Sequence, residues 1–277
     1  MRGAWKLGTL AGIGVYVHWS FLLLPALVGW AAMDDGVGAA LTAVLFVLAV
    51  FGCIVLHELG HALAARRFGI PTRDITLLPI GGVARLARIP RNPWQELVIA
   101  LAGPIVNVVI AVAVTIGLQL NGGFQHLMDA DVLAGSFLEQ LVRTNIALVI
   151  FNMIPAFPMD GGRVMRAMLA FGMPYLRATQ IAAGVGQFLA LLLGLLGLFA
   201  GQLTLVLLAG FVFFAARSEL ASVRAEMLWR EAVYREQAAA PFASEVQPVY
   251  VMPDLNQADT DPPRSRVILA EIVDPDR

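Results

Sequence analysis

Residues 57–61 read HELGH, so two imidazoles and a carboxylate stand within five positions. In a helix, residues four apart lie on the same face, so His57 and His61 could direct two ring nitrogens to one metal ion at about 2.0–2.1 Å. Glu58, next to the first imidazole, is placed to act as a general base toward water. The H-E-x-x-H spacing therefore predicts a zinc-dependent peptidase site.

The surroundings of this motif make the prediction more specific. A soluble helix can carry the pattern by chance, but here it ends an apolar run, residues 36–56, that contains no Asp, Glu, Lys or Arg. An ionisable group inside a membrane span costs roughly 2.5–3.5 kcal/mol on insertion scales, so such groups mark functional sites. Arg66 marks the end of the run, and His57 precedes it by nine residues, or about 14 Å of helix. Water from the cytoplasm could reach that depth.

A catalytic zinc needs a third protein ligand and one open position. The candidate side chains near apolar segments are few: His18, Glu96, His126, Glu139 and Asp160. We expect Asp160 to be the ligand, because Pro155 and Pro158 interrupt the helix before it and let the backbone bend inward. Gly161 and Gly162 follow it and permit unusual backbone angles.

Two further features could contact a peptide substrate. Asn152 precedes Asp160 in the same apolar segment, and its amide could donate to an oxyanion or to the substrate backbone. Residues 71–93 mix β-branched and apolar residues with the pair Gly81 and Gly82, and they are too short to span a bilayer. We expect a β-hairpin at the membrane interface there, with an ordinary cytoplasmic loop as the alternative.

The composition is that of a membrane protein. The chain is 58% hydrophobic and 14% charged, with a mean hydropathy of +0.75, whereas soluble domains are about 25% charged. The formal net charge of −1 gives no basic surface, so we expect a lipid bilayer and not nucleic acid as a partner. The class we expect is an integral, multi-pass membrane protein.

The expected fold is all-α and polytopic, with about six transmembrane helices and a small membrane-associated β-hairpin between the second and the third. The apolar segments predict helices at residues 14–33, 37–66, 95–118, 138–157, 178–199 and 202–218. The expected domains are a membrane core at 1–218, a cytoplasmic helix at 219–240 and a mostly disordered cytoplasmic tail at 241–277. A signal peptide is the alternative for the first apolar run, although this run is longer than the apolar region of a usual signal peptide.

Positive charges predict the orientation. With the N-terminus in the cytoplasm, nearly all arginines that flank the spans fall on the cytoplasmic side, and only Arg143 lies toward the outside. Both termini are then cytoplasmic, and the candidate site lies nearer the cytoplasmic face.

Three motifs together resemble a known family. HELGH in the second span, LAGPIVN in the third and NMIPAFPMDGGR in the fourth look like the site-2 proteases, which are zinc intramembrane metalloproteases. The opening GIGVYVHWSFLLL is similar to the prokaryotic branch that includes the sporulation pro-sigma-factor processing protease. The resemblance covers residues 8–218. Relatives with paired CBS repeats have a longer tail than this chain, so we expect no such pair and no PDZ insertion.

The resemblance implies a role for each residue of the site. His57, His61 and Asp160 would bind one Zn²⁺ per chain, Glu58 would be the base, and Asn152 would assist at the oxyanion or the substrate. The hairpin with Gly81 and Gly82 would pair with an unwound substrate strand, a form of β-augmentation.

The implied activity is that of an intramembrane zinc metalloendopeptidase. It would cut within or next to the transmembrane segment of a single-pass membrane protein, such as an anti-sigma factor, a pro-sigma factor or a signal-peptide remnant, in a prokaryotic cell membrane. Two alternatives stay open. One is an inactive membrane protein that only binds metal or partners. The other is a different class of membrane zinc protease, which would take its third ligand from Glu139.

Overall fold

The computed structural model describes residues 3–79, 81–88, 90–121 and 135–239. Four helices in these ranges are long and apolar enough to cross a bilayer: α2 (Val37–Arg67), α3 (Pro93–Leu120), α6 (Tyr175–Phe199) and α7 (Leu203–Ala239). At most 33% of the apolar window of each is buried inside the protein, so most of that surface needs lipid around it. The chain is an integral membrane protein that is mostly helical.

The expected count of six spans is not confirmed, since the described residues contain four helices that meet the length and apolarity of a span. The helix expected at 14–33 is wrong over its first residues, which form the strand β2 (Ile13–His18). The 3₁₀ helix η1 (Trp19–Leu22) and the helix α1 (Leu23–Ala31) follow it and together are shorter than a span. Ile13, Val15 and Val17 are buried while the residues between them are not. This alternation is a strand pattern that averaged hydropathy conceals.

The fourth expected span is also shorter than predicted. Helix α4 (Phe137–Asn152) begins at a capping box, in which Ser136 and Glu139 bond to each other's backbone, and it ends before Pro155. The chain then turns through residues 153–159 and enters helix α5 (Asp160–Ala170). A short 3₁₀ helix, η2 (Met33–Asp35), precedes α2.

A four-stranded sheet in the order β1-β2-β3-β4 adds a β component to the expected all-α fold. Strands β3 (Thr72–Leu78) and β4 (Gly81–Leu86) form the antiparallel hairpin predicted between the second and third spans. Strand β1 (Ala4–Leu10) pairs with β2, and β2 runs parallel to β3, with Val15 opposite Ile75. The N-terminal strands, which were not predicted, therefore lie at the same end of α2 as the loop that follows it.

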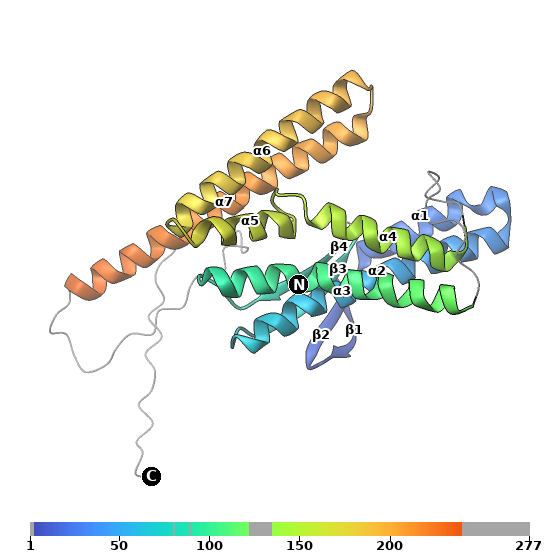
Figure 1. Ribbon diagram of the computed structural model, residues 1–277, viewed down its shortest axis with the longest axis horizontal. Coiled ribbons are helices and arrows are strands. Elements are labelled where there is room, and N and C mark those ends of the chain that lie inside the picture. The colour runs from blue at the N-terminus through green and yellow to red at the C-terminus, as the bar shows by residue number, and fades with distance from the viewer. Residues whose placement is uncertain (1–2, 80, 89, 122–134, 240–277) are drawn as a thin grey trace, which may run out of the picture. The chain divides into compact units, whose positions relative to one another are not determined.

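Helices α2, α3 and α4 lie side by side, and α6 and α7 form a second, antiparallel pair (Figure 1). Gly60 allows α2 and α3 to approach closely, because a Cβ there would lie 2.8 Å from the Ala102 carbonyl oxygen. Gly201, with a φ of +67°, makes the turn between α6 and α7 where the sequence predicted it. Helix α3 contacts both α2 and α5, and these three helices supply residues to the candidate site.

The chain divides into two compact units, Met1–Leu220 and Ala221–Arg277, and the candidate site lies in the first. The cytoplasmic helix expected at 219–240 is continuous with the last span, since α7 runs without a break from Leu203 to Ala239. The tail expected at 241–277 lies outside the described residues.

Candidate active site

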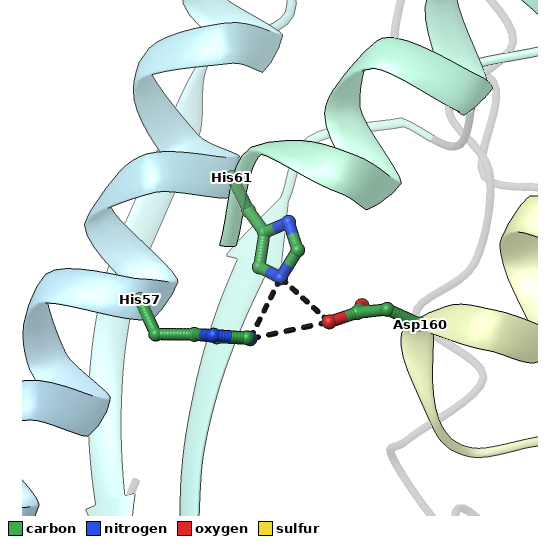
Figure 2. Close-up of side chains that lie close together, drawn as sticks. All are labelled: His57, His61 and Asp160. Atoms are coloured by element: carbon green, nitrogen blue, oxygen red, sulfur yellow. Dashed lines mark hydrogen bonds and ion pairs between the residues drawn. The ribbon is translucent and has the colours of Figure 1, made fainter. Parts of the chain in front are cut away.

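Two helices supply three converging ligand atoms. His57 and His61 extend from one face of α2, and Asp160 is the first residue of α5 (Figure 2). Asp160 Oδ2 lies 3.1 Å from the Nε2 atom of each histidine, and the two Nε2 atoms are 3.1 Å apart. All three residues are buried. The sequence placed these three residues in one site, and the structure brings them together.

The Nδ1 atom of each imidazole has a hydrogen-bond partner. His57 Nδ1 lies 2.7 Å from Asn107 Oδ1, and His61 Nδ1 lies 2.6 Å from the Ile99 carbonyl oxygen. Each Nδ1 therefore donates its proton, which leaves both Nε2 atoms as lone-pair acceptors. Two acceptor nitrogens and a carboxylate oxygen at 3.1 Å repel one another unless a cation lies among them. Imidazole nitrogen and carboxylate oxygen are zinc ligands, so the residues fit a zinc ion.

The neighbouring helix leaves room beside these nitrogens. Gly103 of α3 faces the two histidines, and a Cβ at this position would lie 2.6 Å from His57 Nε2 and still closer to His61 Nε2. A residue other than glycine would therefore occupy the space where the ligand atoms converge. This constraint explains why an apolar helix with Pro104 in its interior carries a glycine there.

Asp160 is held in place by a close approach of backbone segments. A Cβ on Gly161 would overlap the Ile154 carbonyl oxygen, and one on Gly162 would lie 2.7 Å from the Ala156 carbonyl carbon. The two glycines are helical and lie outside the left-handed region, contrary to the expectation that they provide unusual angles. They are needed because the turn of residues 153–159 packs directly against the first turn of α5.

A buried cation further along α5 anchors this helix. Arg166 Nε donates to Glu96 Oε1 at 2.8 Å, and its Nη1 donates to Glu219 Oε1 at 2.5 Å, so α5 is joined to α3 and α7. Burial by itself lowers the pKa of Arg166, but the two carboxylates outweigh it and raise that pKa above its usual value. Arg166 therefore stays charged and keeps α5, with Asp160 at its start, against α3.

Glu58 points from α2 toward the sheet. Its Oε2 accepts a hydrogen bond of 3.2 Å from the backbone N–H of Ala84 in β4. A Cβ on Gly82 would lie 2.8 Å from Glu58 Cγ, so the strand passes very close to this side chain. The carboxylate predicted to be the base is thus oriented by the strand predicted to bind substrate.

A cavity of about 470 Å³ opens in front of these residues. Its walls include Glu58, the three converging residues, Gly81, Gly82, Asn152 and Arg163. The volume is within the range of ordinary ligand sites. Asn152 also lines the cavity, and its Nδ2 atom donates to the Leu148 carbonyl oxygen of its own helix at 3.0 Å.

The remaining ligand candidates are engaged elsewhere or lie outside the description. Glu139 accepts a bond of 2.6 Å from the Ser136 N–H at the start of α4, Glu96 binds Arg166, and His18 bonds to Ser20. His126 lies outside the described residues. Sequence reasoning missed Asn107, although a buried amide within an uncharged span is itself a signal.

The fold and the site are those of a membrane metalloprotease. A model of peptidase family M50 matches residues 45–132 and 125–193, and the chain belongs to this family. The chain is 37% identical over 252 residues to a zinc metalloprotease of Methanocaldococcus jannaschii, covering 91% of this chain and 69% of that protein. It is 26% identical over 163 residues to stage IV sporulation protein FB of Bacillus subtilis, covering 58% of this chain and 53% of that protein.

A solved structure agrees with this assignment. The site-2 protease from Methanocaldococcus jannaschii matches with a TM-score of 0.57 and 37% sequence identity, covering 78% of this chain and 95% of that one. The resemblance to site-2 proteases is therefore confirmed. The chain is a zinc metalloprotease, and zinc is its metal cofactor.

Proposed function

We propose that this protein is an intramembrane endopeptidase that hydrolyses a peptide bond within or next to the transmembrane segment of a single-pass membrane protein. The observation that carries the proposal is the convergence of His57 Nε2, His61 Nε2 and Asp160 Oδ2, all acceptors, beside Glu58 in one cavity. These three residues would bind one zinc ion per chain. Zinc held there would supply Lewis-acid chemistry toward a carbonyl and would lower the pKa of a water molecule.

Glu58 is the proposed general base. Its carboxylate would take the proton of the attacking water and pass it to the leaving amine, a role that typically contributes about 10²–10⁴-fold to the rate. The backbone N–H of Ala84 donates to one oxygen of Glu58, and Glu58 lines the cavity beside the three converging residues. Asn152 would donate its amide to the oxyanion after turning away from Leu148.

The substrate would bind to β4 as an added strand. This strand is at the end of the sheet order, and the Ala84 N–H points away from β3 and toward the site. A substrate helix hides its peptide bonds in its own hydrogen bonds, so it must unwind before it can pair with Gly81 and Gly82. Anti-sigma factors, pro-sigma factors and signal-peptide remnants are substrates of this chemical kind.

The cytoplasmic orientation has structural support. Strand β2 pairs with β3, and Arg66 Nη1 donates to the Ala11 carbonyl oxygen at 2.8 Å. The N-terminal strands, the arginine-rich end of α2 and the sheet thus lie at one end of the protein. By the positive-inside rule, we propose that this end lies in the cytoplasm and that the active site lies nearer that face. The prokaryotic cell membrane is likewise part of the proposal.

The test is cleavage of a single-pass membrane protein by the full chain in detergent, with zinc measured on the same samples. We expect Glu58→Gln to keep about one zinc and to lose about 10²–10⁴-fold in cleavage rate. Asp34→Asn, an exposed change, is the control and should leave both unchanged. Cleavage by Glu58→Gln at the wild-type rate would contradict the mechanism. Zinc binding without cleavage by the wild type would instead indicate a binding protein.

A further inference from the structure

The two histidines of the site are oriented by groups of different chemistry. His61 Nδ1 lies 2.6 Å from the backbone carbonyl of Ile99, which can only accept, so the ring proton must be on this nitrogen. His57 Nδ1 lies 2.7 Å from the side-chain amide of Asn107. An amide carries both an acceptor and a donor, and it can turn over. Asn107 therefore orients His57 only if a further group orients Asn107.

That further group is Asn145 of α4. Asn107 Nδ2 donates to Asn145 Oδ1 at 3.0 Å, and Asn145 Nδ2 donates to the Leu141 carbonyl oxygen at 2.8 Å. The Asn145 amide also lies 3.5 Å from Cys53 Sγ. Both asparagines are completely buried, so these hydrogen bonds are shielded from solvent.

The direction of each hydrogen bond in this network follows from its last acceptor, the Leu141 carbonyl. The Leu141 carbonyl can only accept, so the NH₂ of Asn145 must face it. The oxygen of Asn145 then faces Asn107 and requires the NH₂ of Asn107 there. The oxygen of Asn107 is left for His57 Nδ1, which must donate. The Leu141 carbonyl of α4 thus determines which ring nitrogen of His57, in α2, carries the proton.

We propose that Asn145 is a positioning residue for the metal centre. Through Asn107 it holds His57 in the tautomer that presents the Nε2 lone pair to the site. The inference rests on the proposed role of His57 as a zinc ligand. Without Asn145, the Asn107 amide is free to turn its NH₂ toward His57, which moves the ring proton to Nε2, where the zinc must bind. Losing such an outer partner typically weakens metal binding about 10–100-fold.

The experiment measures the zinc affinity of the full chain in detergent by competition with a chelator. We expect Asn145→Leu to weaken zinc binding about 10–100-fold. Asn145→Ala serves the same purpose if leucine is not accommodated. Thr144→Val is the matched control, because it removes a hydroxyl that donates to the Gln140 carbonyl oxygen at 2.8 Å on the same helix. It should bind zinc like the wild type.

A second variant separates orientation from packing. In Asn107→Asp, either carboxylate oxygen can accept from His57, so nothing needs to orient this side chain. We expect this variant to retain zinc, and the double variant with Asn145→Leu to bind zinc at least as tightly as Asn107→Asp alone. An equal loss from Asn145→Leu in both backgrounds would overturn the proposal, since it would show a packing role.

A parallel variant separates this inference from the proposed site. His57→Ala should lose tight zinc binding. Unchanged affinity in His57→Ala would contradict the ligand assignment and the inference with it. Strong loss in His57→Ala combined with wild-type affinity in Asn145→Leu would overturn the inference alone.

Discussion

The backbone N–H of Ala84 donates to Glu58 Oε2 at 3.2 Å, which joins the edge of the sheet directly to the proposed catalytic base. The two residues come from segments separated by the end of α2 and the whole of β3. This bond limits the positions that Glu58 can adopt. It also joins β4, the strand that would bind substrate, to the residue that follows the ligand candidate His57.

Gly82→Ala is expected to reduce cleavage and leave zinc in place. Its Cβ would lie 2.8 Å from Glu58 Cγ and 3.0 Å from Ile54 Cγ2, so the Glu58 side chain or the strand must shift, which would disturb the bond from Ala84. The measurement is cleavage rate together with zinc per chain. Gly8→Ala is the control, since its Cβ meets open space in another strand of the same sheet. An active Gly82→Ala would show that the position of Glu58 is not limiting.

Gly103→Ala is expected to abolish tight zinc binding, because the new methyl group would stand against both Nε2 atoms of the site. Gly117→Ala on the same helix is the matched control, because its Cβ meets nothing within 4 Å. Alanine is favoured over glycine in a helix by about 0.8–1.0 kcal/mol, so the control should fold at least as well as the wild type. Zinc in Gly103→Ala equal to that of the control would contradict the placement of the metal.

Asp160→Ala and Glu139→Ala should separate the two candidates for the third ligand. We expect about one zinc per wild-type chain, a strong loss in Asp160→Ala and full retention in Glu139→Ala. Glu139→Ala removes one half of a capping box, so its effect should be a loss of stability of about 0.5–2 kcal/mol. Metal analysis of the purified variants decides the matter. Zinc that persists without Asp160 and disappears without Glu139 would reverse the assignment.

Arg166→Met is expected to destabilise the folded protein by about 3–5 kcal/mol, because it removes the buried cation that pairs with the fully buried carboxylate of Glu96 and also bonds to Glu219. Unfolding in mixed detergent measures the change. Arg177→Met, at an exposed position, is the control and should change stability by less than about 0.5 kcal/mol. Equal stability of the two variants would show that the buried ion pairs do not anchor α5.

Much of the candidate site follows from local sequence. Two histidines four apart on a helix share a face wherever the helix lies, so the pairing of His57 and His61 needs no tertiary information. The apolar composition dictates a membrane environment, because such surfaces cannot be covered in water. The Gly81–Gly82 pair between β-branched residues was sufficient to predict the β3–β4 hairpin.

The sequence was misleading where a strand lies inside a long uncharged run. Residues 14–18 belong to a long uncharged run, and their average hydropathy favours a helix. Their alternating burial against the sheet makes them a strand, and this alternation is visible only when each face is considered separately. For this reason, and because α4 ends at Asn152, four of the six expected spans have a full-length counterpart among the described residues.

Contacts between distant segments were decided by the tertiary structure alone. Glu58 meets Ala84, His57 meets Asn107, and Gly103 faces both histidines only because α2, α3 and the sheet pack in one particular way. Local sequence determines which face of a helix carries a group. The partner of that face depends on packing among elements far apart in the chain, and in this protein that packing determines the ring tautomers and the position of the base.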